Sequence, residues 1–538
     1  MDTKLEENVS ERAKSHRLAT TSPVKAFDAI GLNEVVLSRL IVLLAMLAGT
    51  FLRIWQINAI GYNTDEAVYA GEAAGIAGIT SLKAFFPIFR AHPLLAPFLL
   101  SLIDRIQFSD LAGRLLAAAV GLGTVYLTYA IGKALYGRLP GALAAAVLAL
   151  MPYHVVVSRQ FLLDGPMVFF ATLTLYMLTR FGKSQRPAWL YAAGVTMGLT
   201  VLSKETGIIM MGAIYTFLAL SPKVRVRIRD LLVASVLALL VIAPFPITIL
   251  LAGGASTGRS YLTWQLFRRP NHDWFFYFQV IPPALGIVTV ILAVLGLVVL
   301  WRERSWRESL LLSWIFIPFA FFQIWPVKGF QYLLPIAPAV ALLAGRFLGK
   351  LVTSVQNIHL PGKAPVYLSV PPVLSWLVIG GLVLSLGTAS WRRVQPQPSS
   401  LFLAGTGGVP GGREAGDWIL QNVPANATLL TIGPSMANII EFYGQRKAYG
   451  LSVSPNPLHR NPSYEPILNP DRQIRTSDVQ YLVWDSFSAS RSQFFSVKLL
   501  GYVNKYNGRV VHTESITVPD SQGNPVVEPI IIIYEVHP

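Results

Sequence analysis

Long apolar segments recur through the first two-thirds of the chain, and short polar loops separate them. A segment of about 18 or more apolar residues with few charges is long enough to cross the hydrocarbon core of a bilayer. With two shorter segments that flank one polar break, the pattern predicts about eleven membrane spans. The predicted spans are residues 40–57, 111–135, 140–157, 164–181, 190–202, 207–220, 231–251, 280–301, 310–325, 332–348 and 368–390.

The polar stretches divide the rest of the chain. Residues 1–37 form a polar tail, and residues 38–391 are the predicted membrane domain. Within it, residues 58–110 contain no span of full length, so we expect a first outer loop with helices that lie at the interface. Residues 392–412 are rich in Pro, Ser and Gly and predict a linker. Residues 413–538 alternate between helix and strand patterns, which predicts a small α/β domain.

Basic residues orient this arrangement. They gather in the loops at residues 180–186, 223–229 and 302–307. Cytoplasmic loops carry an excess of Lys and Arg, so these loops and the N-terminus are predicted to be cytoplasmic. The first outer loop and the C-terminal domain then lie outside the cell (plasma) membrane. The fold class is therefore a polytopic α-helical membrane protein with an extracytoplasmic α/β domain.

Composition excludes several classes of protein. Of 538 residues, 53% are hydrophobic and 13% are charged, whereas soluble proteins carry roughly 25% charged residues. The formal charge of +16 could suggest nucleic acid as a partner. Because the cations lie in loops between spans, we interpret them as topology signals that contact the lipid bilayer, with no nucleic acid. The absence of cysteine excludes disulfides, thiolate metal sites and a cysteine nucleophile.

The candidate chemistry begins at Asp65-Glu66, directly after the first span. Two carboxylates so close to hydrocarbon are costly and indicate a functional site. Asp164 opens a span and Arg159 lies five residues before it, which is also costly unless the two pair or bind something. The polar residues predicted at the same outer face are His92, Arg159, Asp164, Lys204, Arg268, His272 and Lys328.

Several short motifs occur in a fixed order on this face. They are Asp65-Glu66, His92-Pro93-Leu94, Ala112-Gly113-Arg114-Leu115, the segments 158–164 and 198–204, and the segment 328–335 that contains Tyr332. In these motifs the chain resembles the C-type (GT-C fold) glycosyltransferases of the protein O-mannosyltransferase and aminoarabinose-transferase type, glycosyltransferase families 39 and 83. The resemblance covers about the first two-thirds of the chain.

The chain departs from the family pattern at two positions. Leu94 stands where the family usually has a second proline, and Gln331 stands where an arginine often precedes the tyrosine. The second departure leaves open which residue holds the donor phosphate on that side.

The resemblance implies transfer of a sugar from a polyprenyl-phosphate donor to a hydroxyl of a protein, lipid or glycan acceptor, with inversion, in the membrane domain. Such a transfer needs a carboxylate to take the acceptor's proton. It also needs cations that stabilise the phosphate leaving group. We expect Asp65 to be the base and Glu66 to position it or to orient the acceptor. Asp164 would hold acceptor or sugar hydroxyls, or position a cation.

The substrate-binding prediction adds residues without ranking them. Arg159, Lys204 and Lys328 are candidates for the lipid phosphate, and His92, Arg268, His272 and Tyr332 complete the set. Two carboxylates and one histidine do not establish a metal site. No cofactor is therefore assigned, and a divalent cation stays an open alternative.

Two other functions compete with this prediction. Intramembrane carboxylates and broken helices also mark a transporter or a lipid flippase, but here the charges crowd one face and the two halves show no similarity. A scaffold that displays the C-terminal domain would leave Asp65 and Glu66 unexplained. No paired carboxylates stand out in the C-terminal domain, so we expect it to bind acceptor or partner, and the membrane domain alone to hydrolyse donor.

Overall fold

The computed structural model describes residues 33–87, 92–251, 261, 263–299, 301, 305–353, 355–358, 366–369, 372–396, 409–520 and 522–538. Most of the predicted N-terminal tail and of the predicted linker lie outside these residues. The first helix begins at Glu34, six residues before the predicted span. Asn33 accepts a hydrogen bond from the backbone N–H of Val35 (3.0 Å) and so caps this helix.

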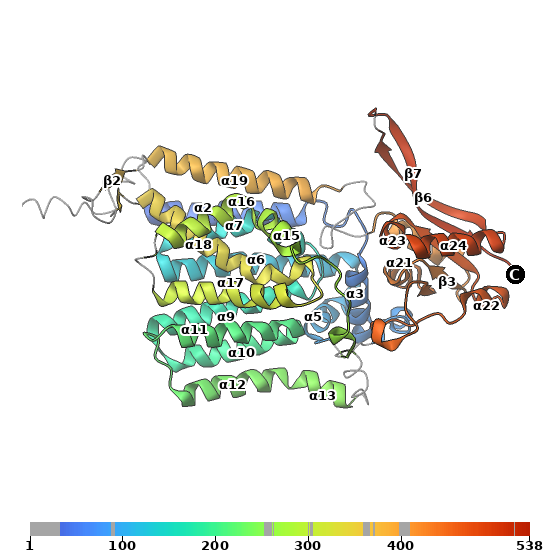
Figure 1. Cartoon of the computed structure of the whole chain (residues 1–538), viewed down its shortest axis with the longest axis horizontal. Helices are drawn as coiled ribbons and strands as arrows, with labels where there is room; N and C mark the ends of the chain where they lie inside the picture. The colour runs from blue at the N-terminus through green and yellow to red at the C-terminus, as the bar shows by residue number, and fades with distance from the viewer. Residues whose placement is uncertain are drawn as a thin grey trace, which may run out of the picture.

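The membrane domain is a bundle in which most helices run roughly parallel to one another (Figure 1). Its elements are α2 (Glu34–Ile54), α6 (Asp110–Tyr136), α7 (Arg138–Leu150), α8 (Pro152–Val157), α9 (Asp164–Ser184), α10 (Pro187–Ser203), η2 (Glu205–Ile208), α11 (Ile209–Leu220), α12 (Ile228–Ile242), α13 (Pro244–Leu251), α15 (Phe276–Leu285), α16 (Ile287–Val299), α17 (Trp306–Ile324), η4 (Phe330–Ile336), α18 (Ala337–Thr353) and α19 (Pro372–Val394).

Fewer of these helices meet the requirements for a membrane span than the sequence predicted. In the described part of the chain, five helices are long and apolar enough to cross a membrane. The number rises to seven if each of two bent helix pairs counts as one span. The bent pairs are α12 with α13, at 41°, and α15 with α16, at 93°. The predicted spans at 140–157, 190–202 and 207–220 correspond to the shorter helices α7 with α8, α10, and η2 with α11. The count of eleven stays a prediction.

Small residues bring the central helices into close contact. α7 is rich in alanine and is buried along nearly its whole length. A Cβ on Gly132 of α6 would lie 2.5 Å from the Cα of Gly141 of α7, and a Cβ on Gly345 of α18 would lie 2.6 Å from the Pro140 carbonyl oxygen. Small residues at these positions let the helix backbones approach closely. In lipid, where the hydrophobic effect does not drive helices together, this close packing stabilises the bundle.

Three short helices lie at the end of the bundle that faces the C-terminal domain (Figure 1). They are α3 (Thr64–Ala77), α4 (Thr80–Lys83) and α5 (Leu95–Asp104), and they occupy the region predicted as the first outer loop. Their position in the lipid interface stays a prediction. At the opposite end, β1 (Val355–Ile358) pairs antiparallel with β2 (Val366–Ser369), a hairpin that the sequence analysis did not predict.

The C-terminal domain is built on a five-stranded sheet of order β4-β3-β5-β7-β6. β3 (Thr428–Thr431) pairs parallel with β4 (Lys447–Gly450) and with β5 (Tyr481–Asp485). β7 (Pro525–Glu535) runs antiparallel to β5 and forms a long hairpin with β6 (Arg509–Pro519). The other elements are α20 (Gly412–Asn422), α21 (Pro434–Ile439), η5 (Ile440–Gly444), η6 (Pro457–His459), α22 (Pro470–Arg475), α23 (Ser486–Arg491) and α24 (Gln493–Lys505).

Candidate functional site

The N-terminus of α3 fixes the position of Asp65. Asn63 caps the helix: its side chain accepts a hydrogen bond from the backbone N–H of Glu66 (3.0 Å), and Glu66 accepts one from the backbone N–H of Asn63 (3.1 Å). This reciprocal pair is a capping box, which satisfies two backbone donors at the helix start. Asn63 also donates to Gln160 (2.9 Å). Asp65 therefore lies in the first turn of a well-anchored helix, with its side chain exposed.

Glu66 points the other way, into the protein, and is fully buried. Arg114 of α6 donates from Nε to Oε1 (2.9 Å) and from Nη2 to Oε2 (2.8 Å), and the backbone N–H of Phe161 donates to Oε1 (3.0 Å). A carboxylate so enclosed by donors cannot reach an acceptor substrate. Of the two roles that the sequence left open for Glu66, the geometry contradicts acceptor orientation and leaves positioning.

Asp164 forms an ion pair with Lys204, and both side chains are buried. Lys204 Nζ donates to the two carboxylate oxygens at 2.9 and 2.8 Å and lies 4.9 Å from the centre of the Tyr332 ring. Arg159 instead donates from Nη1 to the carbonyls of Leu52 (2.7 Å) and of the following residue, at the C-terminal end of α2. Of the two alternatives left open for Arg159 and Asp164, the structure therefore contradicts their pairing, because the cation that reaches the carboxylate comes from the end of α10.

A second pair extends this polar group. His92 Nδ1 lies 3.3 Å from Glu205 Oε2, and Tyr261 donates to Glu205 Oε1 (3.0 Å). The sequence analysis did not single out Glu205 or Tyr261. The sequence did contain a signal for Glu205 as a site residue, since it adjoins Lys204 in the polar break between two short apolar segments. It contained no such signal for Tyr261. Burial lowers the pKa of His92, but the Glu205 carboxylate outweighs this effect and holds the pKa above its ordinary value.

Asp65 lies close enough to these groups to feel their charges. Burial among protein atoms raises its pKa; Lys204 and His92 lower it and Asp164 raises it, so the net pKa lies above the ordinary value. Because solvent still reaches the side chain, the carboxylate lies in a recess that protein surrounds on most sides. A carboxylate with a raised pKa in a cleft is a candidate general base.

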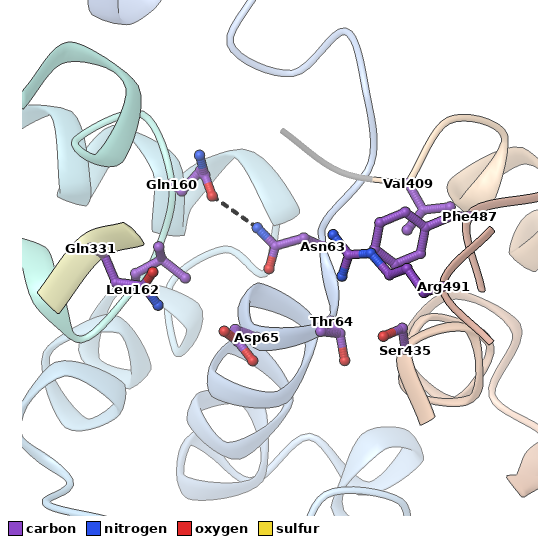
Figure 2. Close-up of a pocket in the computed structure, with 10 residues that line it drawn as sticks. All are labelled: Asn63, Thr64, Asp65, Gln160, Leu162, Gln331, Val409, Ser435, Phe487 and Arg491. Atoms are coloured by element: carbon purple, nitrogen blue, oxygen red, sulfur yellow. Dashed lines mark hydrogen bonds between the residues drawn. The ribbon is translucent and has the colours of Figure 1, made fainter. Parts of the chain in front are cut away.

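The recess is an interdomain pocket, shown in Figure 2. Its membrane-domain wall contains Asn63, Thr64, Asp65, Gln160, Leu162 and Gln331, and its C-terminal-domain wall contains Val409, Ser435, Phe487 and Arg491. The Arg491 side chain extends from α23 toward the start of α3 (Figure 2). The pocket thus combines one candidate base with polar groups from both domains.

Comparison with known proteins agrees with this architecture. Residues 91–247 match the family model described as dolichyl-phosphate-mannose-protein mannosyltransferase. No curated protein matches the chain. Among solved structures, ArnT from Cupriavidus metallidurans in the apo state is 15% identical with a TM-score of 0.63, over 92% of this chain and 97% of that chain. The structure of the same protein bound to undecaprenyl phosphate is 14% identical with a TM-score of 0.61, over 93% of this chain and 97% of that chain.

A third similar structure is the archaeal oligosaccharyltransferase AglB from Archaeoglobus fulgidus, in complex with an inhibitory peptide and a dolichol-phosphate. It is 13% identical with a TM-score of 0.55, over 91% of this chain and 74% of that chain. The chain therefore has the fold of these GT-C proteins over nearly its whole length, and residues 91–247 match the mannosyltransferase model. The resemblance stated from the motifs is thereby confirmed at the level of the fold.

The remaining predicted cations occupy different places in the chain. Lys328 is buried, and its ammonium donates to the carbonyls of Gln323 (2.9 Å) and Trp325 (3.3 Å). Arg268 lies 4.5 Å from the ring centre of Trp264. The exposed His272 stacks on the Phe276 ring, with the ring centres 3.9 Å apart. The contacts of Lys328 point to a structural role. Of the predicted set, the charges of His92, Asp164 and Lys204 act on Asp65, and Tyr332 contacts Lys204.

The C-terminal domain contacts the loop that precedes α3 and the start of α6 in the helix bundle. Arg413 of α20 donates to Asp110 of α6 (2.5 Å) and to the side chain of Asn58 (2.7 Å). Tyr443 donates to the same Asp110 carboxylate (3.0 Å) and accepts from the backbone N–H of Tyr62 (2.9 Å). These contacts show that the C-terminal domain packs directly on the segment that leads to Asp65. That the membrane domain alone hydrolyses donor stays a prediction.

Proposed function

We propose that this chain is an integral membrane glycosyltransferase that moves a sugar from a polyprenyl-phosphate donor to a hydroxyl acceptor, with inversion, on the extracytoplasmic face. The observation that carries the proposal is Asp65, exposed in a pocket at one end of the bundle beside the Asp164–Lys204 pair. Similar solved structures are described as bound to undecaprenyl phosphate and to a dolichol-phosphate, which supports a polyprenyl donor.

The reaction that these residues can perform is a single displacement. The acceptor hydroxyl oxygen attacks the anomeric carbon while Asp65 takes its proton. The bond between the anomeric carbon and the phosphate oxygen breaks, and the phosphate leaves with the electron pair. Attack opposite to the leaving group inverts the anomeric centre. Asp65 ends protonated and returns its proton to solvent through the open side of the pocket.

Lys204 is the cation that the geometry favours for the leaving phosphate or the sugar. It is the candidate whose charge acts on Asp65, and it is held in place by two hydrogen bonds from its ammonium to Asp164. A preorganised cation beside the site of developing negative charge stabilises the transition state without reorganisation. We therefore assign Asp164 to the positioning of Lys204 in addition to sugar contacts.

The transporter alternative finds less support in this geometry. Transport sites lie near the bilayer midplane at the junction of repeats, whereas the Asp65 pocket lies at one end of the bundle, against the C-terminal domain. Release of polyprenyl phosphate from polyprenyl-phosphate mannose or aminoarabinose, by the purified full chain in nanodiscs, tests the enzyme directly. Transport of these lipids without cleavage would contradict the proposal.

The activity is expected to depend on pH through Asp65. A general base acts when ionised, and the pKa of Asp65 lies above its ordinary value of about 3.9. Turnover should therefore fall as pH is lowered, at a higher pH than for an ordinary aspartate. The measurement is kcat against pH for donor hydrolysis. A rise in kcat with a midpoint at or below about 4 would show that Asp65 is not the limiting ionisation.

The sidedness is expected to follow the basic loops. Ser184 ends α9, roughly 30 Å along the helix from Asp164 at its start, since each residue adds 1.5 Å. Single cysteines at Ser184 and at the exposed Gln493 of α24 should be labelled by an impermeant reagent from opposite sides of the membrane. The buried Ser488 is a poor reporter for the C-terminal domain. Labelling of both cysteines from one side would overturn the proposed topology.

A further inference from the structure

A second cavity lies beside the Asp65 pocket along the same helix. It measures about 330 Å³ and is lined by α3, by the segment after α4 and by the C-terminal domain. Asp65 lines the first pocket, whereas Val68 and Glu72 line the second. Residues spaced by three, four or seven positions share one face of a helix. The two cavities therefore follow one another along a single face of α3.

α21 contributes to the lining of both cavities. Ser435 lines the first cavity, and its neighbour Pro434 lines the second. Asn438, which also lines the second, donates to Thr64 Oγ1 (2.8 Å), which lines the first. Asp65 and Glu72 are seven residues apart on α3, roughly 10 Å along the helix axis. One or two sugar rings span such a distance.

Carboxylates outnumber ammonium groups among the described residues that line the second cavity. Glu72 of α3 and Glu441 of η5 are buried, and Glu465 is exposed. Lys447 Nζ lies 3.2 Å from a carboxylate oxygen of Glu441 and 3.2 Å from one of Glu465. Among the described residues that line this cavity, three side chains thus carry a carboxylate and one carries an ammonium. Carboxylates accept hydrogen bonds from hydroxyl groups, and they repel a ligand that carries phosphate or carboxylate.

Aromatic side chains also line this cavity. Phe85, Phe86 and Tyr464 line the same cavity as the carboxylates. An aromatic ring offers a rigid apolar surface, which suits the C–H face of a sugar ring while its hydroxyls turn to polar partners. Carboxylates and aromatic rings around one cavity are a combination that fits a hydroxyl-rich, uncharged ligand.

We propose that this cavity binds the acceptor and that the acceptor is a neutral glycan, whose attacking hydroxyl reaches Asp65 along α3. The proposal rests on the proposed function, since it places the acceptor of that reaction. It adds a substrate class: a glycan without phosphate or carboxylate on the sugars next to the attacking hydroxyl.

Saturation-transfer NMR on the full chain in nanodiscs tests this assignment. The probes are maltose, cellobiose, mannobiose and chitobiose, each compared with its 6′-phosphate. At least one neutral disaccharide should bind, at least tenfold more tightly than its phosphate. Glu72→Gln should weaken that binding about tenfold, as for loss of a charged hydrogen-bond partner. Glu528→Gln, at an exposed position of β7, is the control and should bind as wild type does.

The exposed Glu465 supplies a second variant in case Glu72→Gln does not fold. Glu465→Gln should weaken binding by about threefold, the smaller effect of a partly solvated hydrogen bond. Equal or tighter binding of the phosphates, or folded variants that bind as wild type does, would overturn the assignment. Donor hydrolysis separates the two proposals: hydrolysis without disaccharide binding overturns this inference alone. Disaccharide binding without hydrolysis overturns the proposed function and the acceptor role with it.

Discussion

Asp65→Asn is expected to lower turnover by about 10²–10⁴-fold, the usual contribution of a positioned general base. The amide keeps the size and polarity of the side chain, and the capping box of Asn63 and Glu66 that anchors α3 does not involve Asp65. Donor-lipid binding should be largely kept, because the phosphate is assigned to Lys204. The measurement is kcat and donor affinity for the purified variant.

Asp478→Asn is the matched control, since this exposed carboxylate lies in the C-terminal domain after α22. It should leave turnover as it is in the wild type. Equal turnover of Asp65→Asn and wild type, in folded and donor-bound protein, would remove Asp65 from the mechanism. Asp164 would then be the next carboxylate to test.

Arg114→Ala is expected to destabilise the protein by about 3–5 kcal/mol, the usual cost of leaving one partner of a buried ion pair uncompensated. Arg114 donates to both oxygens of Glu66 and also to the carbonyls of Ile57, Ile60 and Gly61. Without Arg114, the backbone carbonyls of the segment that leads into α3 would lose their hydrogen-bond donors. Thermal unfolding in detergent, followed by tryptophan fluorescence, measures the effect.

The double variant Glu66→Gln with Arg114→Met is the control for this prediction. It removes both charges and keeps much of the side-chain volume, so it should recover part of the stability lost in Arg114→Ala. Arg114→Lys should fall between wild type and Arg114→Ala, because an ammonium cannot reproduce the bidentate geometry. If all three variants unfolded at the wild-type temperature, the Glu66–Arg114 pair would not anchor α3.

The sequence could predict where helices begin and end more readily than what their polar ends contact. The predicted spans at 40–57, 111–135 and 368–390 match α2, α6 and α19 within a few residues at most ends, because bilayer thickness sets the length of an apolar run. The 93° bend between α15 and α16 interrupts one predicted span. The hydrophobic pattern could not predict this bend, since the segments on both sides of it are apolar.

The candidate site was predicted as a set of residues but not as pairs. The predicted membrane side grouped Asp164, Arg159 and Lys204 at one end of the bundle, but the sequence did not indicate that Lys204 is the cation that pairs with Asp164. Lys204 reaches Asp164 across 40 positions because α9 and α10 run side by side, and tertiary packing of that kind leaves no local signal. The burial of Glu66, by contrast, did have a local sequence signal. Asn63 and Glu66 have the spacing of a capping box, in which the glutamate side chain bonds to the backbone at the helix start.

The contacts between Arg413 or Tyr443 and the loop before α3 also bear on how the protein is made. Asp110 pairs with Arg413 across 303 positions, and the backbone of Tyr62 bonds to Tyr443 across 381. During synthesis the membrane helices emerge first, so α3 and Asp65 can be in place well before either partner has left the ribosome. On the proposed topology, the pocket gains its second wall only when the last quarter of the chain has crossed the membrane and folded. Under the proposed function, a partly made chain thus meets donor lipids before the two domains have formed the complete pocket.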